Sequence, residues 1–276
     1  MSEFFEIFSY GFVIRAFIVG VMVSLCASLL GVTLVLKKYS MIGDGLSHVG
    51  FGAMTIALAL NVAPLYIALP IMFISAFLLL KLRENSSINT DAAIAVISSS
   101  SIAAGVLASS LSGGMNVDVY SYMFGSILAV TKSDVVISSL LCLLILIVYV
   151  FCYNRIFAVT FDEGFASSSG IKTKAFNTLF AMLTAATIIV GMRIMGTMLI
   201  SGLIIFPAIT AMKLFDSYRK VTVSASVISV VAFVIGMILS CAFTYIPAGA
   251  GVILVNLVFL IIATAIAEGN RTHNAQ

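Results

Sequence analysis

Charge is what this sequence has least of. Asp, Glu, Lys and Arg together make up 9% of the 276 residues, whereas 62% are hydrophobic and the mean hydropathy is +1.21. A soluble domain carries about 25% charged residues. This composition excludes an ordinary soluble enzyme, a disordered chain and a nucleic-acid-binding protein. It predicts a polytopic membrane protein, with residues 1–276 forming a single transmembrane domain because no stretch is polar enough for a separate soluble one.

Several other features are missing. Tryptophan is absent, so any aromatic belt must consist of Tyr and Phe. The four cysteines lie in apolar runs without CxxC spacing, which indicates small core residues. The sequence contains no GxxxxGK[ST], HExxH or GxSxG motif. Uphill transport would therefore need an ATPase from another chain, and the common intramembrane protease and hydrolase interpretations have no support.

Apolar runs separated by charges and turn residues predict an all-α bundle. Strand-like alternation is not sustained anywhere in the sequence. With nine spans the N-terminus lies outside and the C-terminus inside. If one segment is re-entrant, the number of spans falls to eight and the N-terminus moves inside. The nine candidate helices are 11–36, 41–60, 62–80, 91–111, 135–153, 175–192, 197–214, 221–243 and 250–267.

The distribution of Lys and Arg predicts the orientation, because cytoplasmic loops of membrane proteins are enriched in both. With the segment 155–174 placed in the cytoplasm, eleven of the fourteen basic residues fall on that side. Arg15, Lys132 and Arg193 remain on the other side. The eleven are Lys37, Lys38, Lys81, Arg83, Arg155, Lys172, Lys174, Lys213, Arg219, Lys220 and Arg271.

Two connections are long enough to have structure of their own. The external connection 112–134 is semi-polar and has room for a short interfacial helix, and we expect its acids Asp118 and Asp134 to be solvated. We expect Arg193 to extend towards the headgroups rather than pair with an external acid such as Asp118. The cytoplasmic segment 155–174 is amphipathic, with aromatic side chains among polar ones, which is typical of a docking element. Its candidate contact residues are Phe161, Asp162, Glu163 and Phe165.

The most informative residues are Asp44 and His48, which lie within the second apolar run. Their i,i+4 spacing places both on one face of a helix. Ionisable groups within a span are costly, so two on one face suggest a shared purpose. Carboxylate and imidazole are suitable ligands for zinc or manganese. Alternatively the two residues only pair with each other. One Asp and one His cannot complete a tetrahedral shell, but a second copy across a two-fold axis would double the set.

Five segments, in order and over essentially the whole chain, resemble the integral-membrane permeases of bacterial zinc/manganese ABC importers. The segment around NVD and FGSILAVT is most similar to the zinc branch of this family. The matching segments are LVLKKYSMIGDGLSHVGFG (34–52), NVDVYSYMFGSILAVTKSD (116–134), FDEGFASSSGIK (161–172), VGMRIMGTMLISGLIIFPAITA (190–211) and IPAGAGVIL (246–254).

This resemblance implies the ABC importer permease fold in the bacterial plasma membrane. It implies a homodimer with ATP-binding subunits and an extracytoplasmic metal-binding protein, no permanently bound cofactor, and zinc or manganese as the transported substrate. The family's intramembrane ligands fall on Asp44 and His48, and its cytoplasmic coupling segment falls on Phe161–Lys172. One departure is Tyr245, two residues before Pro247, where many relatives carry an Asp.

Three alternatives stay open on the sequence alone. An ABC permease for iron chelates or cobalamin would need a wider path and no Asp/His pair. An intramembrane enzyme using Asp44 as an acid would be active without an ATPase partner. A carrier driven by protons or sodium would lose uptake with an uncoupler and tolerate ATP depletion.

Overall fold

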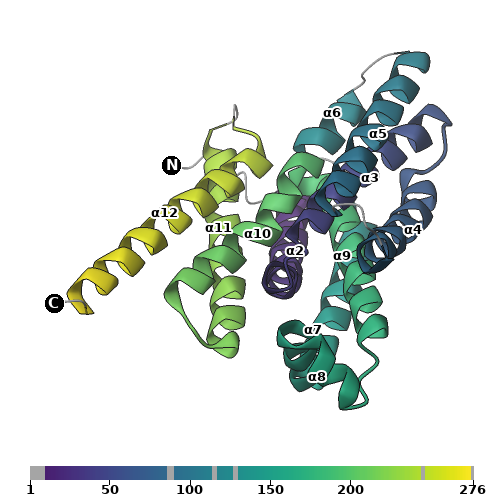
Figure 1. The fold of residues 1–276 in the computed structure, drawn as a ribbon. Coiled ribbons are helices and arrows are strands. Elements are labelled where there is room, and N and C mark those ends of the chain that lie inside the picture. The colour runs from purple at the N-terminus through teal and green to yellow at the C-terminus, as the bar shows by residue number, and fades with distance from the viewer. Residues whose placement is uncertain (1–9, 86–89, 114–116, 127–129, 244–245, 275–276) are drawn as a thin grey trace.

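The computed structural model describes residues 10–85, 90–113, 117–126, 130–243 and 246–274, and in these ranges all regular secondary structure is helical (Figure 1). The predicted all-α architecture is confirmed. The helices are α2 (Gly11–Leu36), α3 (Ser40–Ala59), α4 (Pro64–Asn85), α5 (Thr90–Leu111), α6 (Val117–Phe124), α7 (Lys132–Phe161), α8 (Glu163–Ser168), α9 (Thr173–Met195), α10 (Thr197–Leu214), α11 (Tyr218–Ala242) and α12 (Ala248–Asn274).

Each of the nine predicted apolar runs corresponds to a helix, and the main error is the end of the fifth. We expected that helix to stop at residue 153, but α7 continues to Phe161. Asn154 and Arg155 interrupt the apolar pattern without disfavouring helical backbone. The helix ends at Asp162, whose backbone is extended (φ −146°, ψ 97°) and whose side chain caps the next helix, α8. The short helix expected in the external connection is α6.

The predicted number of eight or nine spans is not confirmed. Within the described ranges, seven helices are long and apolar enough to cross a membrane: α2, α4, α5, α7, α9, α11 and α12. In α10 the apolar stretch is the shorter segment Leu199–Leu214. In α3, which is not among the seven, glycines, serines, Asp44 and His48 interrupt the apolar sequence.

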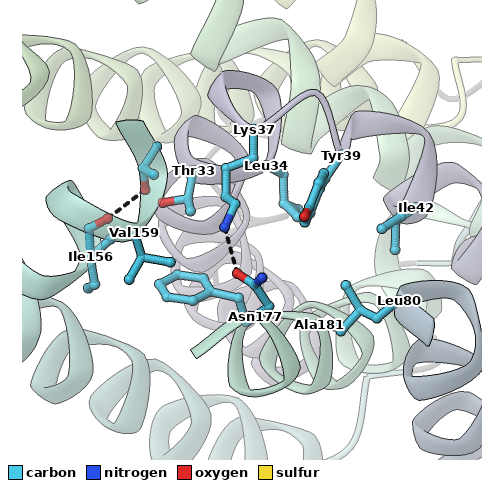
Figure 2. Close-up of a pocket in the computed structure, with 12 residues that line it drawn as sticks. Thr33, Leu34, Lys37, Tyr39, Ile42, Leu80, Ile156, Val159, Asn177 and Ala181 are labelled. Carbon is cyan, nitrogen blue, oxygen red and sulfur yellow. Dashed lines mark hydrogen bonds between the residues drawn. The ribbon is translucent and has the colours of Figure 1, made fainter. Parts of the chain in front are cut away.

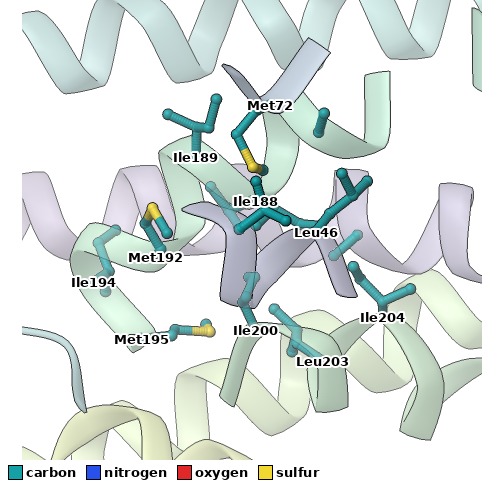
Figure 3. Close-up of a cluster of buried hydrophobic side chains, with 14 of the residues drawn as sticks. Leu46, Met72, Ile188, Ile189, Met192, Ile194, Met195, Ile200, Leu203 and Ile204 are labelled. Carbon is teal, nitrogen blue, oxygen red and sulfur yellow. The ribbon is translucent and has the colours of Figure 1, made fainter. Parts of the chain in front are cut away.

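The bundle has a central group of buried helices and a periphery of more exposed ones. The most apolar windows of α2 and α9 are 72% and 67% buried, whereas those of α5 and α7 are only 22% buried. Packing between α3, α4, α9 and α10 forms a cluster of fully buried side chains that includes Leu46, Met72, Ile188 and Met192 (Figure 3). The apolar side chains that the peripheral helices expose are suited to hydrocarbon.

Small residues bring α3 and α5 into close contact. A Cβ on Gly52 would lie 2.4 Å from the Ser101 carbonyl oxygen, and one on Gly105 would lie 3.0 Å from the Cα of Gly52. Small residues of α5 therefore serve helix packing on this face. This close approach holds α5 along one side of the helix that carries Asp44 and His48.

Alanine at Gly52 should separate these two helices. The added methyl meets backbone that cannot rotate away, so we expect Gly52→Ala to lower the free energy of unfolding by about 1–3 kcal/mol. The matched control is Gly43→Ala on the same helix, where a Cβ would meet only the Ile204 Cδ1 atom at 3.5 Å. The control should be neutral or slightly stabilising, since alanine is a better helix former. The midpoint of thermal unfolding of the detergent-solubilised permease measures both. Equal midpoints for the two variants would contradict the close approach of α5.

An ion pair joins α7 and α9 at the outer end of the bundle, and it shows that two predictions from the sequence were wrong. Arg193, in the last turn of α9, places Nη1 2.5 Å from Oδ1 of Asp134 in the first turn of α7. Asp134 is therefore buried rather than solvated, and Arg193 pairs with an acid rather than extending to the headgroups. The same carboxylate accepts hydrogen bonds from the backbone N–H and hydroxyl of Thr131, both at 2.7 Å. Nearby, the Arg15 side chain donates to the Val130 carbonyl at 3.2 Å. The three basic residues left on the external side thus gather at the start of α7.

Candidate metal site

Asp44 and His48 project from the first half of α3. The distance from His48 Nε2 to Asp44 Oδ2 is 3.7 Å, and the two side chains keep 19% (His48) and 39% (Asp44) of their surface exposed. Asp44 is four residues, or about 6 Å, beyond the first residue of α3. The two groups therefore lie near each other, and both remain accessible from one side of the protomer.

The other faces of α3 are occupied by neighbouring helices. A Cβ on Gly45 would meet Ile94 of α5 at 2.7 Å, and one on Gly50 would meet Met192 of α9 at 2.6 Å. The glycines around the pair therefore serve packing, and α3 is a continuous helix from Ser40 to Ala59. Because its other faces are tightly packed, α3 presents Asp44 and His48 on the one stripe that stays open within the protomer.

Asp44 and His48 together offer two donor atoms of the kind that bind metals, one oxygen and one nitrogen. Within the described ranges, no group of three or more His, Cys, Asp or Glu side chains could hold a metal ion. Met192 and Met195, which could serve as soft ligands, are fully buried in the apolar core. Tyr245, the departure from the family pattern, lies outside the described residues. A complete coordination shell therefore needs donors from outside this part of the chain, such as a second copy or water.

Hydrocarbon would be a costly environment for the open stripe, because the stripe carries charged and polar groups. Met41, three residues before Asp44, extends the stripe and is 43% exposed. On the neighbouring α5, Ser99 and Ser100 are exposed as well. The exposed stripe of α3 thus combines one apolar side chain, Met41, with the polar Asp44 and His48, which suits contact with another protein surface.

The four predicted coupling residues lie at the junction of α7 and α8, and the structure separates their roles. Phe161 and Phe165 are 57% and 64% exposed. The Asp162 carboxylate accepts a hydrogen bond of 2.9 Å from the Phe165 backbone N–H and thereby caps α8. Glu163 instead turns towards the bundle. All four residues are therefore exposed, and the two acids also make polar contacts within the chain.

Glu163 belongs to a polar cluster that sequence reasoning missed. Lys37, at the end of α2, places its ammonium nitrogen 2.5 Å from Glu163 Oε1. It also donates a hydrogen bond of 2.5 Å to Asn177 Oδ1 on α9 (Figure 2). The Asn177 amide donates to Glu163 Oε1 at 3.2 Å. The sequence marked Lys37 only as a cytoplasmic charge, and no local pattern connects residues 37, 163 and 177.

Comparisons with known proteins find relatives over most of the chain. Residues 9–267 match the family model described as "ABC 3 transport family". A protein of Buchnera aphidicola named "High-affinity zinc uptake system membrane protein ZnuB" is 30% identical over 236 residues, 85% of this chain and 90% of that protein. The "Manganese import system permease protein ScaB" of Streptococcus gordonii is 25% identical over 272 residues, 98% of this chain and 97% of that protein.

A solved structure gives the same result at the level of the fold. "PsaBC from Streptococcus pneumoniae in complex with Fab" superposes with a TM-score of 0.84 at 25% identity, covering 95% of this chain and 94% of that one. The helical bundle is that of an ABC transporter permease. The chain belongs to the ABC 3 transport family. It is a multi-pass protein of the bacterial inner membrane, as the composition and the resemblance predicted.

Proposed function

We propose that this chain is the permease subunit of an importer that moves a divalent transition metal, zinc in the first place. One observation carries the proposal. In a bundle that has few ionisable groups, one carboxylate and one imidazole share the open stripe of α3. Relatives named for zinc uptake and for manganese import support a metal as the substrate. Manganese or iron transport by the same mechanism is the second candidate.

The path we propose runs between two copies of the chain. A two-fold axis that brings the open stripes together would gather two copies each of Asp44 and His48, a set of two carboxylates and two imidazoles. These groups would replace part of the hydration shell of the ion and would also be shielded from lipid. In this proposal the chain binds no permanent cofactor, because the metal held by Asp44 and His48 is the transported substrate.

The energy source is a partner subunit. The chain carries no P-loop motif, so ATP binding and hydrolysis take place in separate ATP-binding subunits. We propose that these subunits contact the exposed rings of Phe161 and Phe165 on the cytoplasmic side. An extracytoplasmic metal-binding protein delivers the ion on the other side. The bundle then alternates its access between the two sides of the membrane, which couples ATP hydrolysis on the cytoplasmic side to transport of the ion delivered on the other side.

The choice of zinc over manganese rests on ligand type. Imidazole favours zinc, and the affinity of nitrogen and oxygen sites rises from Mn²⁺ towards the end of the first-row series. Two imidazoles in the completed site would give zinc the advantage in direct competition. A manganese importer would need to overcome this order by geometry or by the choice of its binding protein.

Uptake by the reconstituted complex tests the proposal. We expect proteoliposomes with the permease, its ATPase and the metal-binding protein to accumulate ⁶⁵Zn²⁺ only with ATP, and excess unlabelled Zn²⁺ to suppress uptake more than equal Mn²⁺. A complex whose ATPase cannot hydrolyse ATP is the control. Uptake that collapses with an uncoupler but survives ATP depletion would contradict an ABC mechanism. Uptake of an iron chelate or cobalamin without zinc uptake would contradict the substrate.

A further inference from the structure

The cluster of Lys37, Glu163 and Asn177 joins three helices at the cytoplasmic end of the bundle. Lys37 ends α2, Glu163 begins α8, and Asn177 lies in the second turn of α9. The Lys37 side chain is only 7% exposed although it is charged. Next to it lies a cavity of about 10 Å³, roughly the space for one water molecule, which Ile42 of α3 also lines (Figure 2).

Lys37 is also joined to the helix that carries the metal pair. Its ammonium group lies 5.2 Å from the ring centroid of Tyr39, the residue immediately before α3, in a cation–π geometry. The intervening turn is tight: the Lys38 N–H donates to Val35 at 3.0 Å, and the Tyr39 N–H donates to Leu34 at 2.7 Å. Lys38 takes up the left-handed region, with φ of 58°. A displacement of the Lys37 side chain therefore reaches the start of α3, one turn from Asp44.

The Lys37 ammonium restricts how α8 and the α2–α3 turn can move relative to each other. The Glu163 side chain is 45% exposed, whereas the Lys37 side chain is 7% exposed, so if Glu163 moved away alone the ammonium would lose its carboxylate partner while staying largely buried, which is unfavourable. The low-energy response to a displacement of α8 is for the α2–α3 turn to follow it. Asn177 contacts both charged groups and holds them against α9.

We propose that Lys37, Glu163 and Asn177 form a transmission junction that converts movement of α8 into movement of α3, and so repositions Asp44 and His48. The three are positioning residues, because they act on the metal ligands through the α2–α3 turn. The inference rests on the proposed function, since it takes α8 as the element that the ATP-binding subunit displaces. It adds a defined route inside the protomer from that element to the metal pair.

Two measurements on the reconstituted complex test the junction. The first is the number of zinc ions taken up per ATP hydrolysed, which we expect to fall by about tenfold in Glu163→Gln, the size of a typical coupling between sites. The second is the electron paramagnetic resonance spectrum of a nitroxide on Met41→Cys, in a complex whose four native cysteines are replaced by serine. ATP should change this spectrum in the otherwise wild-type complex, and Glu163→Gln should abolish the change.

Two further variants separate transmission from stability. Lys38→Gln is the matched control, because it removes the neighbouring, exposed lysine and should leave both measurements unchanged. The double variant Lys37→Gln/Glu163→Gln leaves no unpaired charge, so it should regain thermal stability without regaining uptake per ATP. The proposal is overturned if Glu163→Gln keeps the wild-type ratio and spectral change, or if the double variant restores the ratio together with stability.

The same experiment keeps the two proposals apart. If the wild-type complex moves no zinc but the Met41 label still responds to ATP, the proposed substrate is wrong, and the response of the label in Glu163→Gln still decides the junction. If the wild-type complex moves zinc and Glu163→Gln transports with the same ratio, the junction is wrong and the proposed function stands.

Discussion

Alanine at His48 is expected to reduce ATP-dependent zinc uptake by about a hundredfold. Loss of a group that only orients a metal ligand costs about 10–100-fold in affinity or activity, so loss of a ligand itself should reach at least the upper end. In the proposed dimer each substitution removes two imidazoles at once. Uptake of ⁶⁵Zn²⁺ by proteoliposomes containing the full complex measures the effect.

The chain offers its own control for this substitution. His273, the other of the two histidines, lies near the end of α12, and His273→Ala should transport zinc at the wild-type rate. Asp44→Asn should resemble His48→Ala, because the amide keeps the shape of the carboxylate and loses its charge. Undiminished zinc binding in the double Asp44→Ala/His48→Ala variant would show that the pair serves only the structure of α3.

Loss of the Asp134 charge is expected to lower the free energy of unfolding by about 3 kcal/mol. This is the lower end of the range for breaking a buried ion pair, chosen because the Arg193 side chain is still 22% exposed. Asp134→Asn leaves the guanidinium of Arg193 without its carboxylate, while the amide oxygen can still cap α7 at Thr131. The midpoint of thermal unfolding in detergent measures the change.

A second substitution should reverse most of this loss. The double variant Asp134→Asn/Arg193→Met leaves no unpaired charge and should regain much of the lost stability, since buried ion pairs can often be replaced by apolar groups at little cost. Lys132→Gln, an exposed charge two residues away, is the control and should have little effect. A double variant that is less stable than Asp134→Asn would contradict an ion pair as the source of the effect.

The placement of Asp44 and His48 shows what a local sequence pattern can predict. The i,i+4 spacing of Asp44 and His48 was sufficient to place them together, because a helix alone determines that geometry. The spacing could not tell which side of α3 stays open. That depends on where α5, α9 and α10 pack, and the glycines of α3 meet those helices at residues 49 to 161 positions away in the chain.

The two polar contacts that sequence reasoning missed have the same explanation. Arg193 and Asp134 are 59 residues apart, and Lys37 and Asn177 are 140 residues apart. A charge at the end of an apolar run looks like a solvated group when the run is considered alone. Whether it is buried against an opposite charge depends on which helix ends become neighbours in the bundle.

The scarcity of charged residues determined most of what the sequence alone could predict. It predicted a helical membrane protein, nine apolar segments, the likeness to a permease family and one ionisable pair within an apolar run. Local hydrophobicity and helical period suffice for these conclusions, since each depends on residues close together in the chain. Only the tertiary structure decided which face of α3 is open, that Asp134 and Arg193 pair, and that Glu163 turns inwards to Lys37. Those outcomes depend on contacts between distant segments, and no local sequence pattern specifies such contacts.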